Sequence, residues 1–232
     1  METAISEILG VQELETSMTL QPQQTSTAPG LDAGSLPQRD NSAWAEKTSA
    51  VVLTAGEFAT VKAAEGLYVV GITGFSGQWD DAKVAADPGL KAQYDRATET
   101  FRAKFTELLE EHGPNLVISS GATDLGVPKI AYAVAAELGI RALGVTSAKA
   151  VDYKLGQMDW LVVEGADWGA ESPIFLETSD EVIVLGGGGQ AKKEALAASN
   201  DHKKPVTVYQ GFGGKADELT QEEMSSATFV KL

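Results

Sequence analysis

The chain has 232 residues, of which 43% are hydrophobic and 22% charged, and its formal net charge is −15 at pH 7. This composition is that of an ordinary globular domain with a core. The acidic charge argues against nucleic acid or an anionic membrane surface as partner, because both attract basic proteins. The chain contains no cysteine, which excludes disulfides and thiolate chemistry, and two isolated histidines, His112 and His202, make a poor metal site, so none is predicted.

The first segment of the chain lacks the pattern of a folded domain. Residues 21–42 are rich in Pro, Gly, Ser and Gln, and we therefore predict that residues 1–48 form a disordered extension and linker. One face of a short helix within it would carry Ile5, Ile8, Leu9 and Leu14. That helix is either a frayed terminal segment or a docking peptide for a protein partner. The start lacks the basic region of a secretory signal and no stretch approaches about 18 apolar residues, so we predict a cytoplasmic protein.

From residue 49 the pattern changes to short apolar strands separated by helices. In chain order we predict an edge strand and a turn at 49–65, strand 67–73, helix 89–113, strand 115–120, helix 127–139, strands 141–147 and 159–165, helix 172–179, strand 181–187, helix 191–199, strand 205–211 and a last helix at 216–227. Such alternation indicates a parallel sheet covered on both faces. Residues 49–232 are therefore predicted to form one α/β domain, a Rossmann-like, doubly wound, mostly parallel sheet flanked by helices.

Four of the predicted strands end in segments rich in Gly, Ser or Thr. These segments are "GITGFSGQ" at 71–78, "SSGATDLG" at 119–126, "GVTSAK" at 144–149 and "LGGGGQ" at 185–190. In a doubly wound sheet, ligands bind beyond the carboxyl ends of the strands, where the strand order reverses. The sequence therefore predicts one ligand site built from these loops. Lys149 and Lys154, just past the third loop, could reach a phosphate there, although surface lysines need no such role.

The first loop has the pattern G-x-T-G-x-x-G through Gly71, Thr73, Gly74 and Gly77. This pattern after a strand is typical of a dinucleotide-binding turn. However, twelve further residues, "QWDDAKVAADPG", separate the loop from the next helix, and the following strand ends without an acidic residue for a ribose hydroxyl. The chain also has no Y-x-x-x-K sequence. An NAD(P)-dependent reductase is therefore the weakest interpretation, and a tight turn without a ligand is the alternative.

The later loops carry a resemblance to a known family. The stretch "NLVISSGATDLGVPKIAYAVAAELGIRALGVTS", followed by "ETSDEVIVLGGGGQAKKEA", resembles the Lonely Guy (LOG) proteins. It is also similar to the wider superfamily that joins them to the molybdenum-cofactor carrier and DNA-processing protein A. The resemblance covers residues 67 to about 212. It implies a Rossmann-like sheet with a Gly/Ser-rich loop after an early strand and a P-G-G-x-G-T-x-x-E loop after a later one.

The resemblance assigns roles to two glutamates, and it also shows departures from the family. LOG enzymes hydrolyse nucleoside monophosphates with the glutamate of the second motif and an arginine on the preceding helix. Alignment of the strand before the glycines places Glu194 at that glutamate and Glu171 at the arginine, while Gln190 stands at the third glycine. A glutamate cannot supply the fixed donors of an arginine to a phosphate and would repel it. The two glutamates could still serve as acid and base for a ligand that lacks that phosphate. Alternatively, Glu194 is a solvent-facing residue of the helix without a catalytic role.

We predict a phosphate on the amides of Gly187, Gly188 and Gly189 and on the helix that starts near Gln190. The opposite wall is predicted to contain the residues of the two earlier loops: Gly71, Thr73, Gly74, Ser76, Gly77, Ser120, Gly121, Ala122 and Thr123. Trp168 would either stack on a base or a pterin or cap the edge of the sheet. The predicted ligand is thus a phosphorylated small molecule, either a nucleotide or a molybdopterin-like cofactor.

These residues support three functional hypotheses. The first is a carrier or sensor that binds the ligand without turnover, because the position of the catalytic arginine holds Glu171. The second is an N-glycoside hydrolase that uses Glu194, with Glu171 as its partner. The third is the reductase that rests on the first glycine loop. The resemblance also implies a LOG-like homodimer.

Overall fold

A computed structural model of the chain describes residues 42–232. The predicted docking peptide at residues 5–14 lies wholly outside this range. Most of the extension that was predicted to be disordered, residues 1–48, lies outside it as well. Residues 42–48, predicted as the end of the linker, contain a short helix, α1 (Ser42–Ala45). Trp44 on this helix is 9% exposed and packs in a cluster with Ala142 and Leu161.

The domain is built on one eight-stranded sheet in which every ladder is parallel. The strands are β1 (Val51–Leu53), β2 (Tyr68–Gly74), β3 (Leu116–Ser120), β4 (Arg141–Thr146), β5 (Trp160–Val163), β6 (Glu181–Leu185), β7 (Val206–Gln210) and β8 (Thr228–Lys231). They are arranged in the order β1-β5-β4-β3-β2-β6-β7-β8. The predicted α/β class with a doubly wound sheet is confirmed.

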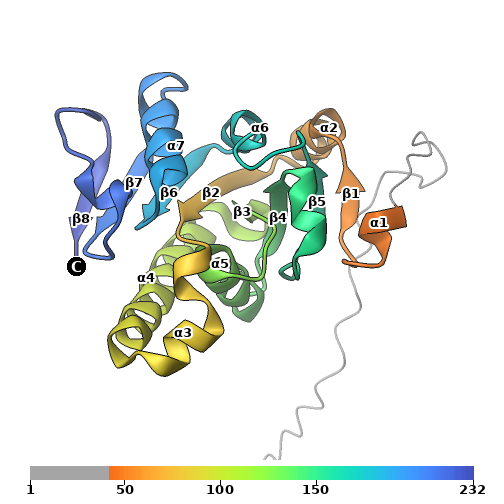
Figure 1. The fold of residues 1–232 in the computed structure, drawn as a ribbon. Helices are drawn as coiled ribbons and strands as arrows, with labels where there is room; N and C mark the ends of the chain where they lie inside the picture. Colours follow the sequence, from red (N-terminus) through yellow and green to blue (C-terminus); the bar gives the residue numbers. More distant parts are fainter. Residues whose placement is uncertain (1–41) are drawn as a thin grey trace, which may run out of the picture. The chain divides into compact units, whose positions relative to one another are not determined.

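Helices cover both faces of this sheet (Figure 1). The longer helices are α2 (Ala55–Glu65), α3 (Asp81–Ala86), α4 (Pro88–His112), α5 (Gly126–Glu137), α6 (Ser172–Thr178) and α7 (Gly189–Asn200). Short 3-10 turns are η1 (Gly77–Trp79), η2 (Gly113–Asn115), η3 (Ala148–Asp152) and η4 (Lys215–Glu218). Helices α3, α4 and α5 lie on one side of the sheet, and α2, α6 and α7 lie on the other. None of the helices in residues 42–232 is long and apolar enough to cross a membrane.

Two parts of the chain differ from the sequence expectation. Residues 49–65, predicted as a strand and a turn, form β1 and the eleven-residue helix α2, which begins with a capping box between Thr54 and Glu57. The helix was missed because its small residues give little apolar periodicity. Residues 216–227, predicted as a helix, contain only the 3-10 turn η4, and the following residues add β8 at the edge of the sheet.

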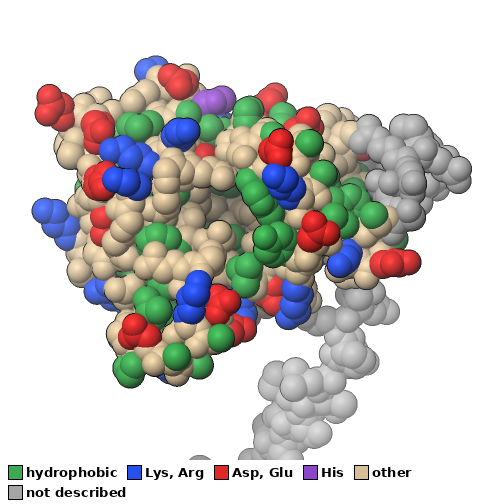
Figure 2. Space-filling model, viewed as in Figure 1, with side chains coloured by type: hydrophobic (Ala, Val, Ile, Leu, Met, Phe, Trp, Pro, Cys, Tyr) green, Lys and Arg blue, Asp and Glu red, His purple; other side chains and the backbone are tan. Residues whose placement is uncertain are grey.

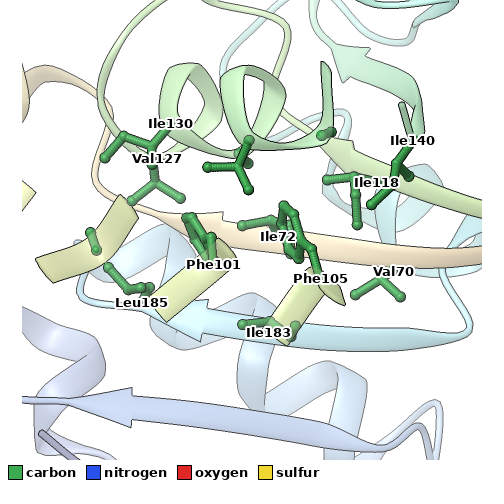
Figure 3. Close-up of a cluster of buried hydrophobic side chains, with 14 of the residues drawn as sticks. Val70, Ile72, Phe101, Phe105, Ile118, Val127, Ile130, Ile140, Ile183 and Leu185 are labelled. Atoms are coloured by element: carbon green, nitrogen blue, oxygen red, sulfur yellow. The ribbon is translucent and has the colours of Figure 1, made fainter. Parts of the chain in front are cut away.

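The larger core lies between the sheet and the pair α4–α5 (Figure 3). Alternate residues of the central strands, such as Ile72 and Ile118, point to this side because side chains alternate along a strand. Phe101 and Phe105, one helical turn apart on α4, stack with ring centroids 5.2 Å apart and are fully buried. This packing fixes β2, β3 and β6 side by side in the middle of the domain.

The strand order reverses between β2 and β6. From β2 the chain proceeds through β3, β4 and β5 on one side, and from β6 it proceeds through β7 and β8 on the other. The carboxyl ends of β2 and β6 therefore form the switch point at which such sheets bind ligands. Both strands end in the glycine loops that the sequence singled out, so the fold brings the first and the last predicted loop together.

A buried acidic side chain lies at the opposite, amino end of β6. Glu181 is 9% exposed, and its Oε2 lies 3.5 Å from the hydroxyl of Tyr68. Burial raises the pKa of Glu181 above its ordinary value, while Lys104 and the Tyr68 hydrogen bond act in the opposite direction. The same neighbourhood, chiefly through burial, raises the pKa of Tyr68 to about 12.

We expect Glu181 to make the stability of the fold decrease as the pH rises from acidic to neutral values. Its raised pKa means that the folded state holds the proton more tightly than the unfolded state, so ionisation above the ordinary glutamate pKa costs stability. The variant E181Q cannot ionise and should be more stable than the wild type at pH 7, with the difference fading below about pH 4. Urea unfolding at both pH values measures this, with the exposed Glu110→Gln as control. An equal difference at both pH values would contradict the assignment.

Candidate functional site

A cleft of about 550 Å³ opens at the switch point. Figure 2 shows the face of the molecule hollowed near its centre. Fourteen of the sixteen predicted site residues line the cleft: Thr73, Gly74, Ser76, Gly77, Ser120, Gly121, Ala122, Thr123, Trp168, Glu171, Gly188, Gly189, Gln190 and Glu194. Gly71 and Gly187 do not belong to the lining. Of the further lining residues, Ile72, Phe75, Gln78, Leu125, Val145 and Thr146 lie in the loops that the sequence predicted for the site, whereas Pro128, Tyr153, Phe175 and Ala191 lie outside those loops.

The four consecutive glycines after β6 divide into two pairs with different roles. Gly186 and Gly187 have φ values of +60° and +114°, which L-residues with side chains rarely adopt. A Cβ on Gly186 would lie 2.5 Å from the Phe75 ring, and one on Gly187 would lie 2.6 Å from Ala191 and 3.1 Å from the backbone of Gly74. Gly188 and Gly189 have no neighbouring atom at that position and are exposed to the cleft. The first pair is thus needed for packing, and only the second pair faces the cleft.

Helix α7 begins directly in the cleft. Gly188 is its N-cap residue, and no side chain caps the first amides of the helix. These amides have no partner within the helix, and they carry the positive end of its dipole. The start of α5, in contrast, is closed by the β2 loop, because Val127 N donates to Phe75 O at 2.6 Å. Of these two helices, α7 is therefore the one that offers free amides to a ligand.

Gly71, predicted as part of the site, is packed inside the sheet under α6. A Cβ there would lie 2.4 Å from Ser179 Oγ and 2.8 Å from the end of the Phe175 ring. The absence of a side chain at this position lets α6 approach β2. Gly74, at the end of the same strand, lies against β6, because a Cβ would be 2.4 Å from Leu185 O. The glycine pattern of the first loop thus has a packing cause at both positions.

Glu194 lies on α7 beneath the free amides and is 6% exposed. Thr73 Oγ1 donates to its Oε2 at 2.5 Å, and Ser172 Oγ donates to its Oε1 at 2.6 Å. The side-chain amide of Gln190 donates to the same Oε1 at 3.0 Å. Both carboxylate oxygens are therefore engaged by donors from β2, α6 and α7. The alternative of a solvent-facing Glu194 is wrong.

Glu171 precedes α6 and is 7% exposed. Its Oε2 accepts from the amide of Gly169 at 2.8 Å, and its Oε1 accepts from the Gln190 side-chain amide at 3.2 Å. Gln190 thus connects the two glutamates that the sequence placed together. Glu171 also holds the loop that carries Trp168, since Gly169 is the next residue.

The β3 loop forms the opposite wall with Ser120, Gly121, Ala122 and Thr123. Ser120 Oγ donates to Ile72 O at 2.8 Å, which attaches the loop to β2. From beneath, the hydroxyl of Tyr132 lies 2.9 Å from Ser120 O and 3.0 Å from Gly121 O. Burial raises the pKa of Tyr132 far above its ordinary value, so its hydroxyl stays a hydrogen-bond donor.

Two exposed aromatic side chains stand at the rim. Trp168 is 44% exposed and Tyr153 is 43% exposed, and their ring centroids are 5.6 Å apart in an edge-to-face arrangement. Both line the cleft. Trp and Tyr each present a large flat face, so a flat ring could pack against them. Tyr153 was missed because nothing in its local sequence distinguishes it from a surface residue.

Among residues 42–232, those that line the cleft include no lysine, arginine or histidine. Lys149 is paired with Asp167 at 2.6 Å and Lys154 with Asp124 at 2.5 Å, so neither cation points freely at the cleft. Glu171 and Glu194 are its only ionisable acidic residues. Within residues 42–232 there is no group of three or more His, Cys, Asp or Glu side chains that could hold a metal ion. An anion in this cleft would be held by backbone dipoles and hydroxyls.

No protein-family model and no curated protein matches the sequence. Solved structures do match. The molybdenum cofactor carrier protein from Chlamydomonas reinhardtii aligns with a TM-score of 0.53 and 18% identity over 71% of this chain and 89% of that chain. The chain has the fold of that carrier. The structural-genomics target TM1055 aligns with a TM-score of 0.52 and 21% identity over 71% of this chain and 92% of its own.

The molybdenum cofactor binding protein from the phototrophic bacterium Rippkaea orientalis aligns with a TM-score of 0.50 and 18% identity, again over 71% of this chain and 89% of the other. The predicted resemblance to this superfamily is therefore confirmed for the fold. At these identities the likeness concerns the fold alone, and the function has to be argued from the cleft.

We expect the hydroxyl of Thr73 to stabilise the fold through Glu194. The variant T73V keeps the shape of the side chain but removes a donor to a buried carboxylate, which costs about 1–3 kcal/mol. Thr123→Val is the matched control, because Thr123 is also 7% exposed and makes no side-chain hydrogen bond within the described residues. Denaturant unfolding of both variants tests this. Equal stability of the two variants would show that the Thr73–Glu194 contact contributes nothing.

Proposed function

We propose that the cleft binds a small phosphorylated molecule with a flat ring and holds it without breaking it, so that the protein acts as a carrier or sensor. The single observation that carries this proposal is the uncapped start of α7, which opens with two exposed glycines into a cleft at the switch point. Free amides at the start of a helix bind phosphate by hydrogen bonds and by the helix dipole. No cationic side chain is needed for this, and the lining supplies none.

The ring of the ligand would lie against Trp168 and Tyr153. The cleft volume of about 550 Å³ falls within the range of ordinary small-molecule sites, about 300–1,000 Å³. A nucleotide and a molybdopterin-like cofactor both combine a phosphate with a flat ring, so both fit this set of donors and aromatic side chains. The solved proteins with this fold include a carrier and a binding protein of the molybdenum cofactor, which supports the carrier role.

Hydrolysis of an N-glycosidic bond is the second candidate, because Glu171 and Glu194 line the same cleft. The contacts of Glu194 argue against it. An acid or base must exchange a proton with the substrate, but three donors already engage this carboxylate, which has about four acceptor positions in all. Among the described residues that line the cleft, none is an arginine that would stabilise the phosphate during cleavage. Binding of the ligand without cleavage is therefore better supported than hydrolysis.

The first ligand contact can be tested at Gly189. We expect G189P to lose one amide donor while the helix keeps its start, because proline is tolerated in the first turn and the space around Gly189 is open. A lost hydrogen bond to an anion corresponds to about 1.5–3 kcal/mol, or roughly a tenfold to hundredfold weaker affinity for the phosphorylated ligand. G189A keeps the amide and should bind like the wild type. Calorimetric titration with four ribonucleoside 5′-monophosphates and a pterin phosphate provides the measurement, and equal affinities of the two variants would contradict the proposal.

Holding and cleavage can be separated with the same compounds. We expect the protein to bind one of the phosphorylated compounds, to show a raised unfolding temperature in its presence, and to release no free base or altered product. Chromatography of the incubated mixture measures release. Base release that the wild type shows and E194Q lacks would establish the hydrolase instead.

The homodimer, the partner for the N-terminal segment and the cytoplasmic location stay predictions.

A further inference from the structure

The loop after β7 was not predicted as part of any site. It comprises residues 211–217, "GFGGKAD", and is called the β7 loop here. Gly211, Gly213 and Gly214 have φ values of +107°, +85° and +83°, so the backbone follows a path that side chains disfavour. Asp217 fixes that path, because its Oδ2 accepts from the amides of Gly211 at 2.9 Å and Gly213 at 2.8 Å. The loop is therefore a built, rigid turn.

The β7 loop is in direct contact with the glycines after β6. Lys215 N donates to Gly187 O at 2.7 Å, and Ala216 N lies 3.4 Å from the same oxygen. A Cβ on Gly214 would lie 2.4 Å from Gly187 O and 2.5 Å from the Phe75 ring. The absence of a side chain at Gly214 thus allows the two loops to approach each other.

This contact controls the orientation of an amide in the cleft. The carbonyl of Gly187 and the N–H of Gly188 belong to one planar peptide group, and in the trans form they point in opposite directions. When the β7 loop binds the carbonyl, the N–H of Gly188 is directed away from that loop. Gly188 lines the cleft as the N-cap of α7.

We propose that the β7 loop is the positioning element of the phosphate site, in which the Lys215 amide and the bare backbone of Gly214 fix the Gly187–Gly188 peptide so that its N–H serves the ligand. This inference rests on the proposed function. None of the loop residues lines the cleft, so their action on a ligand is indirect. Arg96 of α4 extends the same support, since its guanidinium donates to Gly211 O at 2.6 Å and lies over the Phe212 ring at 4.7 Å.

Two neighbouring glycines provide a matched test. G213A and G214A both place an L-residue at a positive φ, +85° and +83° respectively. The new Cβ of G213A meets no atom within 4 Å, whereas that of G214A would press on Gly187 O at 2.4 Å and on the Phe75 ring at 2.5 Å. Affinity is compared for a phosphorylated compound and its dephosphorylated counterpart: AMP with adenosine, or the pterin phosphate with its alcohol, whichever pair the wild type binds.

We expect G214A to weaken the binding of the phosphorylated compound at least tenfold and to leave the affinity for the dephosphorylated compound unchanged. G213A is expected to change neither affinity. A variant that loses only the additional affinity contributed by the phosphate has a misplaced amide. A variant whose cleft has collapsed would bind both compounds more weakly. Equal behaviour of G213A and G214A, or parallel loss of both compounds, overturns the inference.

A second pair acts on the hydrogen bond itself, because a proline at residue 215 replaces the amide hydrogen that points at Gly187 O with its ring Cδ. K215P deletes the amide that donates to Gly187 O, and K215A keeps it while removing the same side chain. Lys215 begins the 3-10 turn η4, a position suited to proline, so the turn is expected to persist. Weaker phosphate binding by K215P than by K215A supports the inference, and equal binding overturns it.

If the wild type binds none of the phosphorylated compounds, the proposed function itself fails. If the wild type binds them and the two variants within each pair have equal affinities, only the positioning role fails.

Discussion

The organisation of this domain depends on one close backbone approach at the switch point. The ends of β2 and β6 pass so near each other that neither Gly74 nor Gly187 has room for a Cβ. Phe75, the next residue, then fits its ring against Gly186 and Gly214. The contact of Gly74 with Leu185 O involves a backbone atom, so it cannot be relieved by a change of rotamer. The approach determines where α7 begins, and α7 in turn supplies the free amides of the cleft.

A single buried carboxylate holds the walls of the cleft together. Glu194 receives hydrogen bonds from β2, α6 and α7, and Gln190 extends the network to Glu171. Three donors thus engage a carboxylate that is 6% exposed, so its contacts are those of a support between the walls of the cleft.

Much of the architecture could be predicted because it depends on patterns that are local in sequence. Apolar strands and amphipathic helices predicted the parallel sheet, and parallel strands bring their loops to one edge, so fourteen predicted residues meet in the cleft. The function of each glycine could not be predicted, because a glycine needed for packing and one that faces a ligand look identical in sequence. Gly71 and Gly187 belong to the first kind. The β7 loop and Tyr153 were missed because their importance arises from contacts across the fold.

The lack of cations in the cleft has a kinetic consequence. The protein has a net charge of −15, and an anion that approaches it meets no attractive field beyond the Debye length of about 8 Å at physiological salt. Backbone dipoles act only at close range, so they retain an anion that has arrived but do not draw it from solution. Under the proposed function, such a site would therefore capture its ligand slowly from a dilute pool.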